Sequence, residues 1–518
     1  MAEEPVTMTF HGMLYERPSD ASAGQETGAP DCFVDLNLDQ IVAAATAGYR
    51  EYDLEPIFHT PLTDAGTVRY RQEIMQDLEQ EDLLAPIKRF AAGMRAMREH
   101  LARAGKLYYK YQKEGWLLDA AAIYCDAVET LAQDLLDADL RSRGFLAFRR
   151  YLVEYTRSDR FTTLAAETRQ LKAELAAVRY CLLIKGSSIR ARRYDGEPDY
   201  SAEIEGIFDR FKQGTVKSHL VELPTSDDMN HVEAAVLELV AKLYPELFQR
   251  LDVFCSEHVD NVDPVVRSFD REIHFYVAYL AYIAPLRQAG LPFCYPTVSA
   301  TDKEVRSRDG FDLALAKKLT AESGRIVCND FHLNGRERIL VVSGPNQGGK
   351  TTFARSFGQL HYLARLGCPV PGREARLFLC DRLFTHFERE ESIATLRGKL
   401  EDDLVRIHRI LREATPRSIV ILNEIFNSTM LHDAIFLSRA IMAELVRLDL
   451  LGVWVTFIEE LASASGKAVS LVSTIVPGDP ASRTYRIIRK PADGVSYAMV
   501  LAEKHRLTYD RIGERLAS

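Results

Sequence analysis

The stretch GPNQGGKTT at residues 344–352 decides the fold class of the C-terminal part of this 518-residue chain. Its first eight residues fit the pattern GxxxxGK[ST]. The apolar run ERILVVS precedes it, and a pattern typical of a helix, from Thr352 to about Leu366, follows it. A strand, a glycine-rich loop and a helix in this order are typical of a loop that binds the phosphates of a nucleotide.

Each residue type in this loop suits a triphosphate. Glycines let the backbone approach the phosphates and present its N–H groups, the N-terminus of the following helix adds partial positive charge, and Lys350 adds a full one. The Thr351 hydroxyl can bind Mg²⁺. We therefore expect ATP and Mg²⁺ as ligands, with contacts to the nucleotide from Gly344, Pro345, Asn346, Gln347, Gly348, Gly349, Lys350, Thr351 and Thr352.

An ATPase of this kind also needs an acidic residue for Mg²⁺ at the end of a neighbouring strand, and a carboxylate that polarises the attacking water. The run SIVILNEIF supplies the candidates, because its apolar part ends at Asn423 and Glu424, where Asp-Glu is expected. Glu424 is the predicted base. Asn423 keeps an acceptor oxygen for the metal site but removes a negative charge, which predicts weaker Mg²⁺ binding and slow hydrolysis.

The spacing of the apolar residues divides the rest of the chain into parts with different expected secondary structure. Residues 1–35 are expected to be a short N-terminal segment with a flexible linker, and residues 36–300 to be helical, because apolar residues recur three and four apart. Within this part, a small basic tip at about 185–200 is expected between two long helices, the second running from His231 to about His258. Short apolar runs that predict strands alternate with helical stretches in residues 301–518, namely Ile339 to Val342, Ile419 to Leu422, Val453 to Phe457 and Tyr485 to Ile488. This pattern predicts an α/β P-loop NTPase domain behind an α-helical core.

Composition excludes several classes of protein. Hydrophobic residues make up 47% and charged residues 27%, as in ordinary globular proteins, and the net charge is -9, so any nucleic-acid binding must come from local basic patches. The eight cysteines have no zinc spacing. Because neither an export signal nor a long apolar run is apparent, we expect a cytoplasmic protein with no membrane partner.

The sequence around the loop resembles the ATPase domain of the MutS family of DNA mismatch-repair proteins, in which the loop reads GPNMGGKST. The family's DEIGRGTS motif is similar to NEIFNST at residues 423–429, which Asp433 follows. The resemblance implies a fold related to ABC-type ATPases. It also implies that Asn346 contacts the γ-phosphate and orients the water, so the predicted catalytic residues are Glu424, Asn346 and Lys350.

Two further stretches are similar to the family. The segment IVCND at residues 326–330 resembles the stretch that packs on the adenine, which makes Ile326 and Val327 the expected adenine contacts. The helical part resembles the family's core and lever, so the resemblance covers about residues 36–518. It implies a homodimer that encloses two ATP molecules, and a clamp that grips the DNA backbone with the end of the lever.

The predicted tip carries four basic residues that are candidates for DNA contacts without base selectivity. They are Lys185, Arg190, Arg192 and Arg193. Acidic residues nearby weaken the field, and the alternative that these side chains form a solvated surface stays open.

The sequence departs from the family pattern in three places. No Phe-x-Glu wedge precedes the ATPase domain, so mismatch recognition by that device is unsupported. The run VTF at residues 455–457 stands where the family has Ala-Thr-His, and the polar group that senses the γ-phosphate is absent. The run LRGK at residues 396–399 stands where the family has the Gly-x-Ser-Thr segment, which makes Lys399 or Arg397 the candidate for a contact with the partner's nucleotide.

The predicted function is therefore that of a MutS-like ATPase that binds DNA as a nucleotide-gated clamp in mismatch repair or recombination. Two alternatives stay open. One is an ATP-gated scaffold that acts on a ribosome or a protein partner, and the other is a nucleotide-binding protein with negligible turnover. The short tip and the missing wedge favour the alternatives, whereas the retained lever favours DNA.

Overall fold

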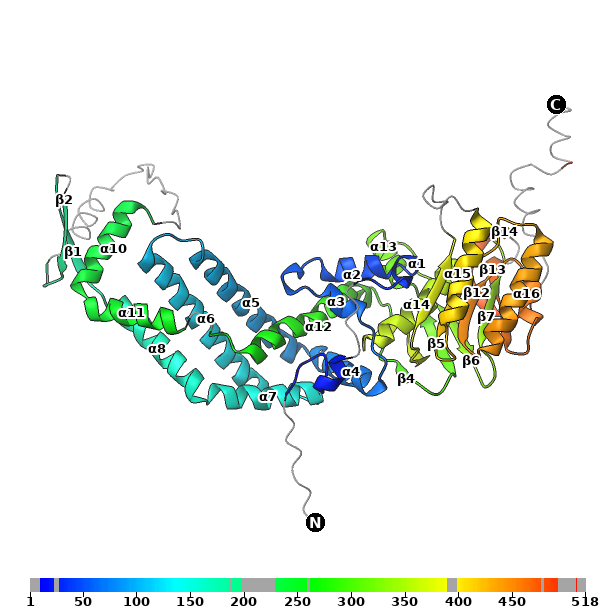
Figure 1. The fold of residues 1–518 in the computed structure, drawn as a ribbon, viewed down its shortest axis with the longest axis horizontal. Helices are drawn as coiled ribbons and strands as arrows, with labels where there is room; N and C mark the ends of the chain where they lie inside the picture. The colour runs from blue at the N-terminus through cyan, green and yellow to red at the C-terminus, as the bar shows by residue number, and fades with distance from the viewer. Residues whose placement is uncertain are drawn as a thin grey trace, which may run out of the picture. The chain divides into compact units, whose positions relative to one another are not determined.

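The computed structural model describes residues 10–22, 28–186, 188–197, 229–258, 261–388, 398–476, 479–491 and 509. Within them a helical region comes first and a mixed α/β region follows, as the sequence predicts (Figure 1). The chain forms two compact units, each built from separate stretches. The described part of unit 1 comes from Gln80–Leu140 and Leu146–Asp270, and that of unit 2 from Phe10–Glu79, Arg141–Phe145 and Arg271–Ser518. The predicted domain limits at residues 35 and 300 stay predictions.

The described part of unit 1 is helical except for one two-stranded hairpin. Its elements are α5 (Glu81–Ala104), α6 (Lys110–Asp137), α8 (Asp159–Ala176), β1 (Tyr180–Lys185), β2 (Ser188–Arg193), α10 (His231–Leu243) and α11 (Pro245–Glu257). Two more helices, α7 (Arg143–Thr156) and α12 (Pro264–Gln288), belong partly to each unit. None of the helices in the described residues combines the length and apolarity that crossing a bilayer requires.

The core of unit 1 follows from the helical periodicity of its apolar residues. On α5, Ile87, Phe90 and Met94 are buried at spacings of three and four. The rings of Phe148 on α7 and Phe269 on α12 stack with centroids 3.7 Å apart, and Phe90 meets Phe269 at 5.7 Å. Three helices are thus joined by aromatic contacts.

The predicted helix from His231 to about His258 is in fact two helices. Helix α10 ends at Leu243, and α11 begins at Pro245, which occupies the first helical turn. Proline lacks an N–H and clashes with the preceding turn of a continuing helix, but it suits the first position of a new one. The sequence prediction missed this break.

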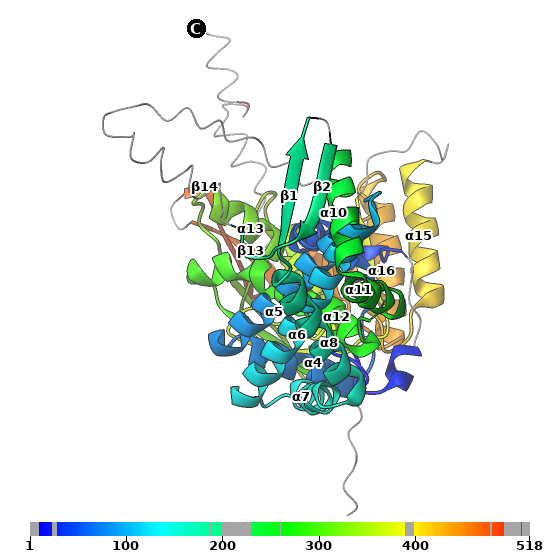
Figure 2. The same cartoon turned by 90° about the vertical axis from the view of Figure 1, so that its left-hand side faces the viewer.

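The hairpin, at residues 180–193, begins earlier in the chain than the tip predicted at about 185–200 and overlaps it; residues 198–200 of that prediction lie outside the described residues. Strands β1 and β2 pair antiparallel, and Lys185 opposite Ser188 is the last pair before the turn. Gly186 in that turn has a φ of +62°, a backbone conformation that glycine adopts without strain. Figure 2 shows the hairpin beside α10, which contacts β2.

Unit 2 holds a six-stranded sheet in the order β10-β11-β12-β7-β13-β14. Five of its strands are parallel, and β14 is antiparallel to β13. The strands are β7 (Ile339–Ser343), β10 (Leu383–Phe387), β11 (Ile419–Asn423), β12 (Leu451–Val455), β13 (Ala468–Val476) and β14 (Asp479–Arg489). Every residue of β7, β11 and β12 is buried, as expected of parallel strands covered on both faces.

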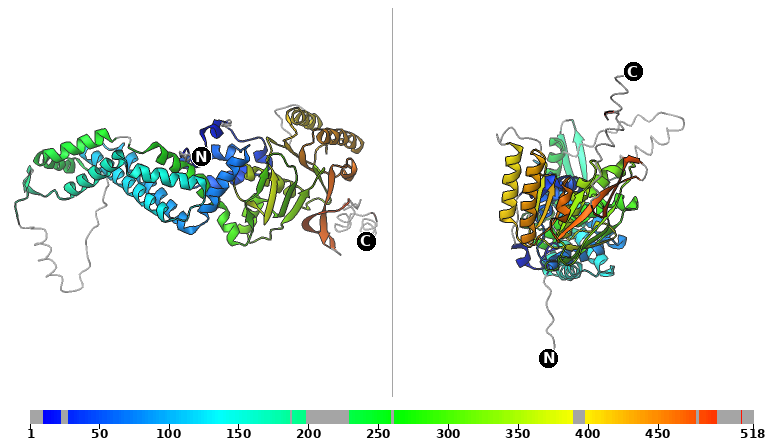
Figure 3. Two further views of the ribbon diagram at one scale, coloured as in Figure 1. Left: turned by 90° about the horizontal axis from the view of Figure 1, so that it is seen from below. Right: turned by 90° about the vertical axis from the view of Figure 1, so that its right-hand side faces the viewer.

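Helices cover both faces of this sheet. Helices α15 (Lys399–Glu413) and α16 (Leu431–Arg447) run along one face (Figure 3), where Ile407 and Met442 share a buried cluster with Trp454. Helix α14 (Lys350–Arg365) lies on the other face, because a Cβ on its Gly358 would lie 2.8 Å from Cδ1 of Ile421. The sheet is thus the middle layer of three.

The other elements of unit 2 surround this layered core. They are α1 (Cys32–Asp35), α2 (Leu38–Thr46), α3 (Glu55–His59), α4 (Ala65–Leu78), α13 (Leu313–Ala321), the strand pair β3 (Phe293–Cys294) and β8 (Val370–Pro371), the sheet β4 (Thr297–Ser299), β9 (Glu374–Phe378), β5 (Val305–Gly310) and β6 (Asn329–Leu333), and the short 3-10 helices η1 (Pro18–Ser22), η2 (Arg50–Tyr52) and η3 (Glu459–Ser463).

Helix α14 is buried almost all round because the N-terminal stretch of unit 2 packs on it. Arg355 Nε donates a hydrogen bond to Asp35 O at 3.0 Å, and Gln359 Nε2 donates to Leu36 O at 2.9 Å. The helix therefore has the sheet on one side and residues close to the start of the chain on another.

Candidate functional site

The loop at residues 344–349 leaves the buried strand β7 at its carboxyl end, the edge at which parallel sheets bind ligands. Gly344 has a φ of +116° and Gly349 of +90°. A Cβ on Gly348 would overlap Ser473 Oγ, which donates a hydrogen bond to the Gly348 carbonyl at 2.7 Å. The loop conformation therefore requires glycine at these three positions.

Lys350 is the most enclosed charge of the loop. Its side chain is 3% exposed, and Nζ donates hydrogen bonds to Gly344 O at 2.8 Å and Pro345 O at 3.3 Å, and contacts Asn346 Oδ1 at 3.4 Å. Burial lowers the pKa of Lys350, while the Glu424 carboxylate 3.7 Å away opposes the shift. A buried ammonium group that contacts mainly neutral oxygens and one carboxylate is suited to bind an anion.

Thr351 and Asn423, the predicted metal residues, lie together. Asn423 is the last residue of β11, and Thr351 Oγ1 donates a hydrogen bond to its Oδ1 at 3.0 Å. Among the described residues, no group of three or more His, Cys, Asp or Glu side chains could hold a metal ion by itself. Two neutral oxygens fit Mg²⁺ that is bound together with phosphates and water, because this ion seldom occupies an all-protein cage.

Glu424, the predicted base, directly follows β11. Its backbone has a φ of +53°, and its N–H donates a hydrogen bond to Val455 O at 2.9 Å, which ties the turn to β12. Few non-glycine residues in proteins adopt this conformation, and those that do are concentrated at functional sites. Burial raises the pKa of Glu424, and the Lys350 ammonium opposes this shift.

Two residues around the loop were not predicted from the sequence, and a third was noted only as a departure from the family pattern. Ser473 of β13 holds the Gly348 carbonyl, and Arg483 Nε of β14 donates a hydrogen bond to Asn346 O at 3.2 Å. The third is Phe457, whose ring centroid lies 4.3 Å from Lys350 Nζ. The first two reach the loop because β13 and β14 follow β7 in the sheet order, which no local sequence signal indicates.

Ile326 and Val327, the predicted adenine contacts, precede β6 and are half-buried. Asn329, just after them, donates a hydrogen bond to Tyr485 O at 3.1 Å and accepts one from the Ile487 N–H at 2.7 Å. A Cβ on Gly349 would lie 3.6 Å from the same Tyr485 carbonyl. Strand β14 therefore connects this stretch to the loop, and the adenine contact stays a prediction.

The four basic residues predicted to bind DNA all lie on the hairpin of unit 1. Arg192 forms an ion pair with Glu197, and Arg193 donates hydrogen bonds to Leu243 O and lies over the ring of Tyr244. Lys185 ends β1, and Arg190 pairs with Leu183 in the hairpin register. The hairpin also exposes apolar side chains, namely Tyr180, Leu182, Leu183 and Ile184.

Residues 340–504 match the family model of MutS domain V, and they include the loop and the turn at Glu424. Over this domain, the chain is similar to the MutS family. The DNA mismatch repair protein MutS of Oleidesulfovibrio alaskensis is 36% identical over 141 residues, which are 27% of this chain and 16% of that protein. The protein of the same name from Desulfovibrio desulfuricans is 30% identical over 232 residues (41% and 25%). That of Ruminiclostridium cellulolyticum is 28% identical over 285 residues (54% and 31%). The chain thus matches less than a third of the length of these relatives.

Two of the departures from the MutS pattern now have a structural setting. Phe457, at the position of the histidine in the MutS motif, covers the loop lysine. Lys399, a candidate for the contact with a partner's nucleotide, forms an ion pair with Glu388 of its own chain. Arg397, the other candidate, lies outside the described residues.

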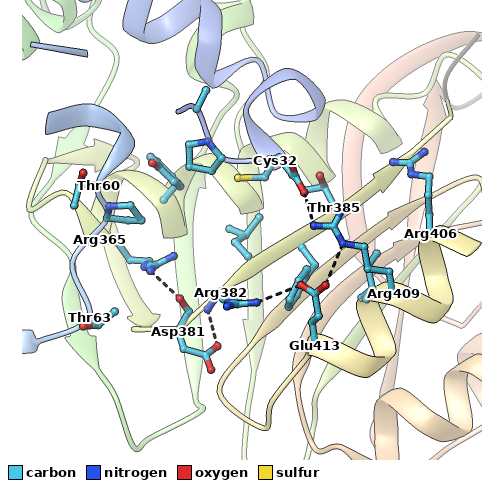
Figure 4. A pocket seen from close by; sticks show the side chains of 18 residues that line it. Cys32, Thr60, Thr63, Arg365, Asp381, Arg382, Thr385, Arg406, Arg409 and Glu413 are labelled. Carbon is cyan, nitrogen blue, oxygen red and sulfur yellow. Dashed lines mark hydrogen bonds and ion pairs between the residues drawn. The ribbon is translucent and has the colours of Figure 1, made fainter. Parts of the chain in front are cut away.

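A cavity of about 620 Å³ in unit 2 contains none of the residues predicted from the MutS resemblance (Figure 4). Several arginines line it, but carboxylates and carbonyls of the same cavity bind them. Arg382 and Arg409 both reach Glu413, and Arg365 Nη2 donates a hydrogen bond to Asp381 O at 2.9 Å. The predicted site therefore lies elsewhere, at the loop after β7.

Proposed function

We propose that this chain is a MutS-like ATPase that binds ATP and Mg²⁺ at the loop after β7, in a domain of the P-loop NTPase class. The observation that carries the proposal is the setting of Lys350, a buried ammonium group surrounded by the oxygens of a glycine-rich loop at the carboxyl edge of a parallel sheet. The MutS domain V match covers the same residues.

Each group at the site has a separate role in the proposed hydrolysis. The loop N–H groups and Lys350 bind the phosphates, and Ile326 and Val327 contact the adenine. Thr351 and Asn423 hold Mg²⁺, which, when bound, neutralises phosphate charge. Glu424 accepts a proton from the attacking water, and Asn346 orients that water. Since Asn423 carries no charge, we propose that Thr351 and Asn423 by themselves bind the metal weakly and that turnover is slow.

Two substitutions test these roles of Lys350 and Glu424. Lys350→Ala is expected to abolish nucleotide binding, because it removes the full positive charge of the loop. Glu424→Gln is expected to keep ATP bound but not to hydrolyse it, because the amide cannot accept the proton. Calorimetric titration and phosphate release measure the two effects. Equal turnover in the wild type and Glu424→Gln would refute the role of this carboxylate.

We further propose that the protein acts on DNA in mismatch repair or recombination, as a cytoplasmic homodimer whose nucleotide state gates a clamp. The support is the name of the relatives, DNA mismatch repair protein MutS. The test is binding to homoduplex, mismatched and branched DNA at several salt concentrations, since phosphate contacts lose affinity steeply with salt. The absence of DNA binding in every nucleotide state would refute this proposal.

An ATP-gated scaffold for a protein partner or a ribosome remains the second candidate, and the hairpin favours it. Two of its four predicted DNA-binding arginines and lysines are engaged within the chain, and its exposed surface includes Leu183 and Ile184. Exposed leucine and isoleucine suit an apolar partner better than a phosphate backbone. Loss of a bound protein partner, with DNA binding unchanged, on Ile184→Ser would support the scaffold.

A further inference from the structure

A cavity of about 500 Å³ lies beside the two predicted metal residues. Thr351 and Asn423 line it, and so do Arg355 of α14 and two carboxylates, Asp35 and Glu388. The sequence predictions included neither carboxylate. Two negatively charged side chains therefore lie in the same cavity as the neutral oxygens of Thr351 and Asn423, the residues predicted to bind Mg²⁺.

Strand pairing explains how Glu388 reaches this place. Strands β10 and β11 are parallel neighbours, and Phe387 lies opposite Asn423 in their register. Glu388 follows β10 just as Glu424 follows β11. Because neighbouring strands lie about 4.8 Å apart, the two glutamates leave the sheet side by side at its carboxyl edge.

The two carboxylates of the cavity differ in their surroundings. Asp35 is buried, its Oδ2 accepts a hydrogen bond from Thr385 Oγ1 at 2.6 Å, and an Arg406 nitrogen lies 3.9 Å from the same oxygen. Glu388 is 42% exposed, and its ion-pair partner is Lys399. Ion pairs at exposed positions are weak, so a divalent cation can displace this lysine. Glu388 is thus the carboxylate that can turn toward a metal.

We propose that Glu388 supplies the negative charge that Asn423 lacks, and supports Mg²⁺ at Thr351 and Asn423 when a nucleotide is bound. This inference depends on the proposed nucleotide site. Magnesium at nucleotide sites usually has one or two carboxylates near it besides phosphate oxygens. With asparagine at the end of β11, the carboxylate comes instead from the end of the next strand, β10.

The test measures metal dependence in place of turnover. The full chain is titrated with ADP by calorimetry over a range of Mg²⁺ concentrations and in EDTA. Glu388→Gln is expected to raise the Mg²⁺ concentration for half-maximal enhancement of ADP binding by about tenfold or more, the usual effect of losing a supporting carboxylate. ADP affinity in EDTA is expected to stay unchanged. The control is Glu374→Gln, which removes an equally exposed, ion-paired carboxylate of β9.

A second variant tests whether charge or shape matters. Glu388→Gln combined with Asn423→Asp is expected to restore the wild-type Mg²⁺ dependence, because the charge returns at the neighbouring strand. Electron paramagnetic resonance of bound Mn²⁺ gives a readout without calorimetry. An unchanged Mg²⁺ midpoint in Glu388→Gln, or no restoration by Asn423→Asp, would overturn the inference alone. Wild-type protein that binds no nucleotide in either condition would overturn the proposed site as well.

Lys399→Met keeps the inference testable should Glu388→Gln not fold. It removes the ion-pair partner and leaves the carboxylate in place, so the Mg²⁺ midpoint is expected to fall. A midpoint that rises or stays unchanged would contradict a role for Glu388 at the metal.

Discussion

Phe457 is expected to compete with a nucleotide for the loop lysine. Its ring centroid lies 4.3 Å from Lys350 Nζ, within the range of a cation–π interaction, and the lysine is nearly fully buried. Such contacts contribute about 0.5 kcal/mol at exposed sites and about 2 kcal/mol when desolvated. The ring is 47% exposed, so a value between these limits is expected.

Phe457→Leu keeps an apolar side chain but removes the ring. If phosphates draw the ammonium group away from the ring, the contact stabilises only the nucleotide-free protein. The variant should then bind ADP about 2-fold to 30-fold more tightly, since 1.4 kcal/mol corresponds to tenfold in affinity. Without nucleotide, its free energy of unfolding should fall by about the same 0.5 to 2 kcal/mol.

The assay pairs two measurements on one protein. Calorimetric titration gives the ADP affinity, and urea unfolding gives the stability of the nucleotide-free form. Phe436→Leu is the matched control, because Phe436 is an exposed phenylalanine of α16, at 69% exposure. Weaker or unchanged ADP binding in Phe457→Leu would refute the competition, whatever the change in stability.

Two further predictions concern the loop and a distant ion-pair cluster. Gly348→Ala should destabilise the protein by about 1 to 3 kcal/mol and weaken ADP binding, because the new Cβ overlaps Ser473 Oγ; wild-type stability in urea would contradict the geometry. Burial opposes ionisation of Asp449, but hydrogen bonds from Lys467 and Lys303 outweigh it and hold the pKa of Asp449 well below its usual range. Its contribution to stability is therefore present above about pH 4, the ordinary aspartate pKa, and is lost as the pH falls below it. Asp449→Asn should thus melt at a lower temperature than wild type at pH 7, with a difference that narrows as the pH falls below about 4; a difference independent of pH would argue against the cluster.

The central strands of unit 2 were predictable because the sequence of a buried parallel strand is a short, continuous run of apolar residues. The runs starting at Ile339 and Ile419 match β7 and β11 closely. The run from Val453 to Phe457 extends beyond β12, which ends at Val455, and this puts Phe457 in the loop over Lys350 and not in the sheet. The prediction for α14 began within two residues of its start, since the loop motif fixes that point.

The surroundings of the loop could not be predicted, because they depend on strand order. Ser473 and Glu388 are separated from the loop by many residues, and each reaches it only after the sheet has assembled. Strand β10, with the sequence LFTHF, carries polar residues and no strong apolar signal. The break before Pro245 was within reach of sequence reasoning, since a proline between two helical stretches favours a new helix start.

The packing of α14 against the first residues of unit 2 limits how this protein can be dissected. A Cβ on Gly358 would lie 2.6 Å from Leu36, and Gln359 donates a hydrogen bond to the carbonyl of that leucine. A recombinant fragment that starts at residue 301 would lack the residues that pack on this side of the helix. That side of α14 would then be exposed to water. Adding residues 10–79 as a separate peptide is expected to restore the folding of such a fragment, and genetic fusions that displace these residues should destabilise α14.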